Sequence, residues 1–180
     1  MDAIHSLGRP YNVLILCTGN SARSILGEAL IERWGRLPAG QVRFRGFSAG
    51  SRPKGQPHPA ALALLESRGL PTTGLRSKSW DEFAAPGAPP IDFVFTVCGN
   101  AAGEACPVWP GTPVRAHWGV DDPAAVEPAG PAQDAAFLRA YLELESRVKE
   151  FAALPLETMD RAALQRAVEA IGRRTASGKP

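Results

Sequence analysis

The stretch Asn12–Ser24, N-V-L-I-L-C-T-G-N-S-A-R-S, most constrains how this 180-residue chain can fold. Residues 13–16 form an apolar run without alternation, which is typical of a parallel strand buried on both faces. Turn-forming residues follow Cys17, and apolar residues at helical spacing occupy 22–34. The sequence therefore predicts a strand, a short loop and a helix, with Cys17 where the strand ends.

The predicted loop has the composition of an oxyanion site. Backbone N–H groups and the positive end of the helix dipole converge there. Arg23 can fold back over the loop and grip a tetrahedral anion with its planar fork. The same field should favour the thiolate of Cys17, and Ser24 can add a hydrogen bond to the sulfur. The predicted anion-binding residues are Thr18, Gly19, Asn20, Ser21, Ala22, Arg23 and Ser24. The alternative is a buried structural cysteine beside a solvated arginine.

Strand and helix patterns alternate along the rest of the chain. Further strands are predicted at 42–48, 91–97 and 114–118, and further helices at 60–68, 134–154 and 160–171. This order predicts an α/β fold, a three-layer, flavodoxin-like sandwich around a central four-stranded parallel sheet. We expect one domain at 11–172, a flexible lead-in at 1–10 and a frayed tail at 173–180.

Composition and charge exclude several classes of protein. The net charge of +2, with no dense basic run, gives no electrostatic case for nucleic acid or a membrane surface as partner. No stretch is apolar and long enough to span a bilayer, and residues 1–10 lack the apolar segment of a signal peptide. We therefore expect a cytoplasmic protein. Its 3 cysteines, an odd number, favour catalytic or redox use over a disulfide framework.

The other two cysteines lie in one turn-rich segment. Cys98 follows the predicted strand 91–97, so it should emerge at the same sheet edge as Cys17. Cys106 comes later, after a stretch of small residues that includes two glycines. A zinc site of these two cysteines with His117 is disfavoured, because the cysteines form no close pair and a fourth ligand is not evident. We expect no metal, and we expect His117 to be a hydrogen-bonded residue at the end of its strand.

Asp122 is the candidate general acid, since it directly precedes Pro123 at the end of the predicted strand 114–118. Asp121 is the neighbouring alternative. The purely structural interpretation is an aspartate that caps the turn before the proline.

The Cys-x5-Arg spacing followed by Ser24 resembles the phosphate-binding loop of the low-molecular-weight protein tyrosine phosphatases and of the arsenate reductases that share their fold. The Asp-Pro at 122–123 matches a late loop of both groups. The segment 96–118, with Cys98 and Cys106, resembles the redox segment of the thioredoxin-coupled reductases, although seven residues separate these cysteines where those relatives have six. Phosphatases usually carry aromatic residues after the Asp-Pro, and this chain has Ala-Ala-Val. The resemblance extends over about 12–170 and implies a low-molecular-weight-phosphatase-like fold.

This resemblance implies an arsenate reductase active in arsenic detoxification. Cys17 would attack arsenate while Asp122 protonates a departing oxygen. Cys98 would then attack the Cys17 sulfur and release arsenite, and Cys106 would move the disulfide outward. The implied catalytic residues are Cys17, Arg23, Asp122, Cys98 and Cys106.

The same resemblance implies no tightly bound cofactor. An external thiol reductant, thioredoxin or else glutaredoxin with glutathione, would restore the thiols. Phosphate or sulfate would mimic the substrate, and a weak phosphatase side activity is expected. Two alternatives stay open, a low-molecular-weight protein tyrosine phosphatase and a non-enzymatic oxyanion or redox sensor.

Overall fold

The computed structural model describes residues 8–99, 103 and 109–174. Its strands are β1 (Tyr11–Cys17), β2 (Phe44–Gly50), β3 (Phe93–Thr96) and β4 (Val114–His117). They form one sheet in the order β2-β1-β3-β4, and every neighbouring pair is parallel. The prediction of an α/β sandwich around four parallel strands is therefore confirmed. Cys106 and most of the expected lead-in and tail lie outside the described residues.

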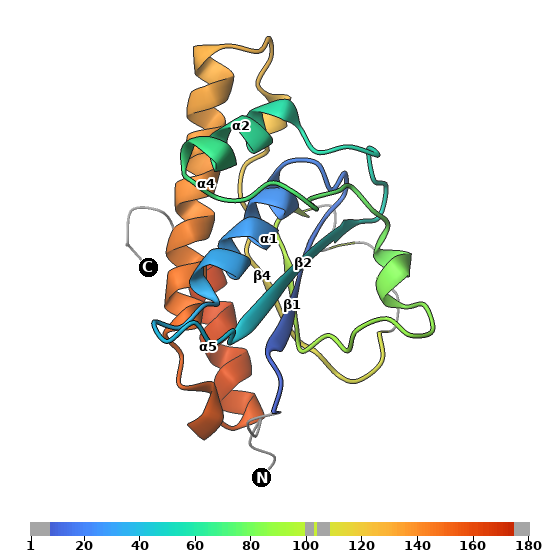
Figure 1. The fold of residues 1–180 in the computed structure, drawn as a ribbon, viewed down its shortest axis with the longest axis vertical. Helices are drawn as coiled ribbons and strands as arrows, with labels where there is room; N and C mark the ends of the chain where they lie inside the picture. Colours follow the sequence, from blue (N-terminus) through green and yellow to red (C-terminus); the bar gives the residue numbers. More distant parts are fainter. Residues whose placement is uncertain (1–7, 100–102, 104–108, 175–180) are drawn as a thin grey trace.

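Four long helices lie on one side of the strands, and a short helix lies on the other (Figure 1). The long helices are α1 (Arg23–Trp34), α2 (Pro59–Ser67), α4 (Pro131–Ala152) and α5 (Arg161–Arg173). The 3-10 helices are η1 (Trp80–Phe83), η2 (Pro123–Ala125) and η3 (Leu156–Thr158). Most bounds agree with the predicted ones within two residues. Helix α4 begins three residues earlier than predicted, because Pro131 suits the first helical turn after Gly130.

The sheet separates two apolar cores, and β1 contributes to both. Val13 and Ile15 pack into the larger core with the long helices. Leu14 and Leu16 pack into the smaller core, which contains Trp80 of η1 and other aromatic and aliphatic side chains. All seven residues of β1 are buried, as the unbroken apolar run predicted.

Three chain segments reach the carboxyl edge of the sheet together. Cys17 ends β1, and Cys98 follows closely after β3, where the Val97 amide donates to the Leu16 carbonyl at 2.9 Å. The chain that leaves β4 is bound at the same edge, since the Trp118 amide donates to the Thr96 carbonyl at 2.7 Å. The edge therefore gathers residues that are far apart in sequence. No helix in the described ranges is both long and apolar enough to cross a membrane.

Candidate functional site

The loop between β1 and α1 is held by backbone bonds from a second segment, residues 52–58. The Arg52 amide donates to the Thr18 carbonyl and the Lys54 amide to the Gly19 carbonyl, both at 2.9 Å, and the segment's last amide bonds the Ser21 carbonyl at 2.8 Å. A trans peptide holds its C=O and N–H in opposite directions. These bonds therefore turn carbonyl oxygens out of the loop and leave the following N–H groups free to face an anion.

Asn20 organises the interior of the loop. Its φ of +40° lies in the left-handed region, which asparagine tolerates better than most residues. Its side-chain Nδ2 donates to Ser24 Oγ at 2.8 Å and to Ser48 Oγ at 2.9 Å, while its Oδ1 accepts from the Lys78 amide at 2.8 Å. These three bonds brace the loop from its interior.

The same bonds orient the serine that lies beside the nucleophile. Ser24 Oγ lies 2.9 Å from Cys17 Sγ, and both side chains are buried. Because the Ser24 oxygen already accepts from Asn20, its own hydrogen is available for the sulfur. Ser24 can therefore act as the hydrogen-bond donor to Cys17 that the sequence predicted.

Beyond Asn20 the network ends in a buried ion pair. Ser48 Oγ donates to Glu28 Oε2, and Lys78 Nζ lies 3.4 Å from the same oxygen. Burial raises the pKa of the Glu28 carboxyl and lowers the pKa of the Lys78 ammonium, and each charge opposes the shift of the other. Sequence reasoning missed this pair. The available signal was the spacing of Ser24 and Glu28, which places two polar side chains four residues apart and so along one side of α1.

The pKa of Cys17 is shifted in the direction opposite to the prediction. The residue is only 4% exposed, and burial raises the pKa of its thiol. The hydrogen bonds from Ser24 and the charge of Arg23 lower the pKa, but burial outweighs them. The prediction that the pKa of Cys17 is lowered is therefore wrong for the net shift. Ser24 and Arg23 nevertheless lower the pKa, as expected.

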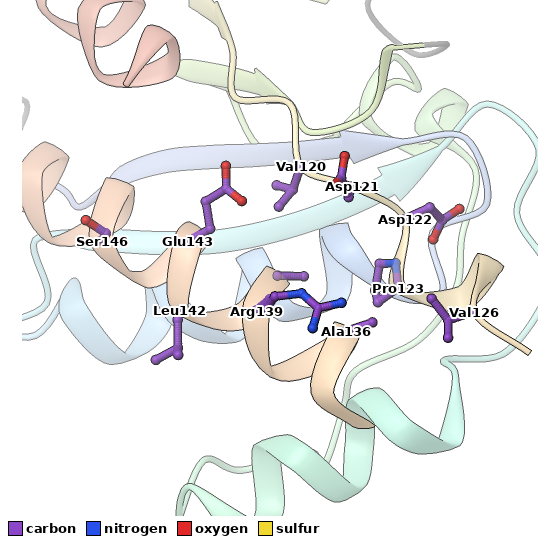
Figure 2. A pocket seen from close by; sticks show the side chains of 11 residues that line it. Val120, Asp121, Asp122, Pro123, Val126, Ala136, Arg139, Leu142, Glu143 and Ser146 are labelled. Atoms are coloured by element: carbon purple, nitrogen blue, oxygen red, sulfur yellow. The ribbon is translucent and has the colours of Figure 1, made fainter. Parts of the chain in front are cut away.

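The candidate acid is joined directly to the candidate clamp. Arg23 Nη2 lies 3.0 Å from Asp122 Oδ2, and Arg23 Nη1 donates to the Val120 carbonyl at 3.1 Å. Asp122 Oδ1 also accepts from the Ala124 amide at 3.1 Å, so the aspartate caps η2 as well. Figure 2 shows Asp121 and Asp122 on one wall of a cavity of about 460 Å³, opposite Glu143 of α4. The ion pair to Arg23 distinguishes Asp122 from Asp121.

Cys98 lies beside the loop. Its side chain is buried, and its sulfur is 3.5 Å from Thr18 Oγ1. The Cys98 thiol also contributes to the raised pKa of Cys17. His117 is hydrogen-bonded at the end of β4, as predicted, with Nδ1 at 2.8 Å from Thr96 Oγ1. Across residues 8–99, 103 and 109–174, no cluster of three or more His, Cys, Asp or Glu side chains could hold a metal ion.

Taken together, a cysteine at the end of a parallel strand, outward-turned loop carbonyls and an arginine that follows the loop at the start of α1 define a site for cysteine chemistry on a tetrahedral oxyanion. The model of the family named low molecular weight phosphotyrosine protein phosphatase matches residues 12–169. The chain belongs to this family.

Its relatives include arsenate reductases. The chain is 35% identical to arsenate reductase of Halalkalibacterium halodurans and 34% identical to that of Bacillus subtilis, each over 140 residues, 78% of this chain and 94% of the relative. The solved arsenate reductase of Archaeoglobus fulgidus is 25% identical with a TM-score of 0.59. The match covers 79% of this chain and 99% of that protein. An arsenate reductase solved in a phosphate-binding state is 25% identical with a TM-score of 0.62, at 79% and 97% coverage.

Proposed function

We propose that this protein is an arsenate reductase. The observation that carries the proposal is the position of Cys98, whose sulfur lies 3.5 Å from Thr18 in the loop that begins at Cys17. A phosphatase of this family needs one cysteine, an arginine and an acid, whereas a reductase needs a second thiol that can reach the first. The arsenate reductase relatives support the same choice.

The first step joins arsenic to sulfur. Arsenate binds to the loop amides and the Arg23 fork, and the proton of the buried Cys17 thiol passes to an oxygen of the arsenate dianion. The Cys17 sulfur then attacks As(V). Asp122 gives a proton to the departing oxygen, which leaves as water. The product is a covalent Cys17 adduct of As(V).

The second step reduces the arsenic. The Cys98 thiolate attacks the Cys17 sulfur, the sulfur–arsenic bond breaks, and its electron pair stays on arsenic. As(III) leaves as arsenite, which takes up protons from solvent, and a Cys17–Cys98 disulfide remains. Two electrons have passed from two thiols to one arsenic atom.

The third step regenerates the thiols. Cys106, which lies outside the described residues, attacks Cys98 and takes over the disulfide. An external dithiol such as thioredoxin, or glutaredoxin with glutathione, then reduces it. A solved protein of Corynebacterium glutamicum, described as a thioredoxin-dependent arsenate reductase, has the same fold at 22% identity and a TM-score of 0.56.

The test is arsenite production from arsenate by the purified protein with thioredoxin, thioredoxin reductase and NADPH. We expect multiple turnovers by the wild type. Cys98→Ser should form no arsenite, and Cys106→Ser should stop after about one turnover, because it lacks only the outward transfer of the disulfide. A parallel assay replaces thioredoxin with glutaredoxin and glutathione.

A phosphatase is the competing function, because Cys17, Arg23 and Asp122 alone suffice to hydrolyse a phosphomonoester. Brisk aryl phosphate hydrolysis that survives removal of both Cys98 and Cys106, with no arsenite formed by either reductant system, would overturn the reductase proposal. Slow aryl phosphate hydrolysis beside arsenate turnover is the expected side activity.

A further inference from the structure

The acid loop, residues 118–122, connects β4 to η2 and carries Asp122. Its amides are held by the sheet, since the Trp118 amide donates to the Thr96 carbonyl and the Val120 amide donates to the Val97 carbonyl at 3.0 Å. Its carbonyls point to other partners. A loop held only through its amides could still rotate about the two amide hydrogen bonds. The partners of its carbonyls therefore determine the position of Asp122.

Two arginines supply those partners. Arg147 of α4 donates from Nη1 to the Trp118 carbonyl at 2.9 Å and to the Gly119 carbonyl at 3.1 Å. Arg23 donates to the next carbonyl, that of Val120. Three consecutive carbonyls of the acid loop are therefore bound by guanidinium groups, one of which belongs to the anion site and one of which does not.

Arg147 is an unusual side chain to bury for packing alone. It is 5% exposed, its Nε finds no hydrogen-bond partner among the described residues, and burial lowers the pKa of its guanidinium. A well-packed apolar residue is often as stabilising as a buried ion, or more so. What an apolar residue cannot supply is a set of directed N–H donors.

The orientation of Arg147 is itself fixed. Its Nη2 donates to Glu143 Oε1 at 2.7 Å, one helical turn away, and to the Arg174 carbonyl at 3.2 Å. Glu143 lies on the side of α4 that faces Val120 and Asp121 across the cavity (Figure 2). Glu143 and the Arg174 carbonyl thus fix Nη2 of the guanidinium, while Nη1 binds the acid loop.

Helix α5 closes the remaining side of the loop's first residues. Trp118 Nε1 donates to the Val168 carbonyl at 3.0 Å. Gly172 packs so close to the strand end that a Cβ there would lie 2.1 Å from the His117 carbonyl oxygen. The loop cannot move toward α5, and loss of the Arg147 bonds would instead release it on the side of Asp122.

We propose that Arg147 is a positioning residue, which acts through the Trp118 and Gly119 carbonyls to hold Asp122 in place for proton transfer to the departing oxygen. This inference rests on the proposed function, because it assigns Arg147 a role through the acid of that reaction. The hydrogen bonds of Arg147 go to the acid loop, to Glu143 and to the Arg174 carbonyl, so its role is indirect.

A double-mutant cycle between Arg147→Met and Asp122→Asn tests the proposal. We expect Arg147→Met to lower kcat about tenfold with KM changed less than about twofold, since a small misplacement of a catalytic group costs rate more than binding. In the Asp122→Asn background the same substitution should change kcat by less than about twofold, because the acid is already gone. Arg147→Lys, which can still donate to a carbonyl, should recover part of the rate.

Arg43→Met is the matched control. Arg43 also binds two carbonyls, those of Ala152 and Leu154, at 2.6 and 2.7 Å, but these belong to the C-terminal end of α4 and the residues after it, not to the acid loop. Both variants should lower Tm, and only Arg147→Met should lower kcat. An unchanged kcat in Arg147→Met, or an equal loss with and without Asp122, would overturn the proposal. If Arg147→Met does not fold, Arg147→Lys carries the same cycle.

The cycle is run on arsenate and on phenyl phosphate, whose poor leaving group also needs an acid. If the wild type reduces no arsenate but hydrolyses phenyl phosphate, the proposed function fails while the role of Arg147 is still measured. If the wild type reduces arsenate and Arg147→Met does so equally fast, this inference fails and the proposed function stands. Absence of both activities would overturn both.

Discussion

The anion loop and the acid loop meet at Arg23 but are built in different ways. The anion loop occupies eight consecutive residues, 17–24, and its side-chain network is buried. The acid loop presents Asp122 with 43% of its side chain exposed, and its backbone is held by residues of β3, α1 and α4. The functional residues of the anion loop therefore lie close together in sequence within a buried network, whereas the acid loop is held by segments far apart in sequence and leaves its acid partly exposed.

Arg23→Lys should have the largest effect, because Arg23 belongs to both halves. Lysine cannot form the fork that grips an oxyanion, and it loses the paired contacts with Asp122 and the Val120 carbonyl. We expect kcat/KM for arsenate to fall about 10³-fold, at the upper end of what one oxyanion donor contributes. Arg33→Lys, at the other end of α1, should leave kcat/KM within about twofold of the wild type. Similar losses in both variants would contradict a specific role of the Arg23 fork, because the charge is kept in both.

Asp122→Asn should separate activity from stability. A general acid contributes about 10²–10⁴-fold to rate, so we expect kcat to fall at least about 10²-fold. The exposed ion pair is worth less than about 1 kcal/mol, so Tm should hardly change. Asp121→Asn serves as the matched variant and should retain most of the activity. If Asp121→Asn had the lower kcat of the two variants, Asp121 rather than Asp122 would be the general acid.

Asn20→Ala should show the opposite pattern in the anion loop, a large loss of stability. It removes three buried hydrogen bonds and places alanine at a positive φ. We expect the free energy of unfolding, measured by urea denaturation, to fall by about 3 kcal/mol. Asn20→Gly loses the same bonds without the backbone strain, so it should be about 1 kcal/mol less destabilising than Asn20→Ala. Equal losses would mean that the left-handed backbone costs nothing there.

Ser24→Ala should have the smallest effect and the most specific one. Burial already raises the pKa of Cys17, and the Ser24 bonds lower it, so their partial loss should raise the pKa further. The rate of iodoacetamide alkylation against pH, measured in a Cys98→Ser, Cys106→Ser background, should show its midpoint at higher pH than in the Ser24 protein. At any pH below both midpoints the variant should therefore react more slowly. A midpoint that moves to lower pH would show that Ser24 accepts from the thiol rather than donating to it.

The two halves of the site also differ in how far the sequence predicts them. The strand, loop and helix around Cys17 follow from an apolar run, turn formers and helical spacing, and the Ser24 contact follows from its place one turn into the helix. The acid loop was predicted only as an Asp-Pro after a strand, with two aspartates left open. The Arg23 ion pair distinguishes the two aspartates, and it joins segments that are far apart in sequence. The neighbouring bond from Arg23 to Val120 spans 97 residues.

What the sequence did not predict depends on burial in three dimensions. Nothing in the sequence pattern distinguishes Lys78, Glu28 and Arg147 from charged residues on the surface. Their burial follows from the packing of segments that are distant in sequence. The pKa of Cys17 was predicted from its attractive neighbours alone, and the sequence gives no measure of the desolvation that outweighs them. Polar residues that lie inside the protein are the part of such a site that periodicity identifies least well.

The internal position of β1 in the sheet has a consequence for biosynthesis. The strand that ends at Cys17 needs both neighbours, and its pairing of Leu16 with Thr96 closes a long stretch of chain. Such non-local pairing forms late, because the entropy of loop closure must be overcome first. A nascent chain that has been synthesised only as far as β2 already contains the whole Cys-x5-Arg motif, yet it lacks β3, the acid loop and α4. The reactivity of Cys17 should therefore appear only after α4 has been synthesised, so shorter nascent chains carry an ordinary thiol.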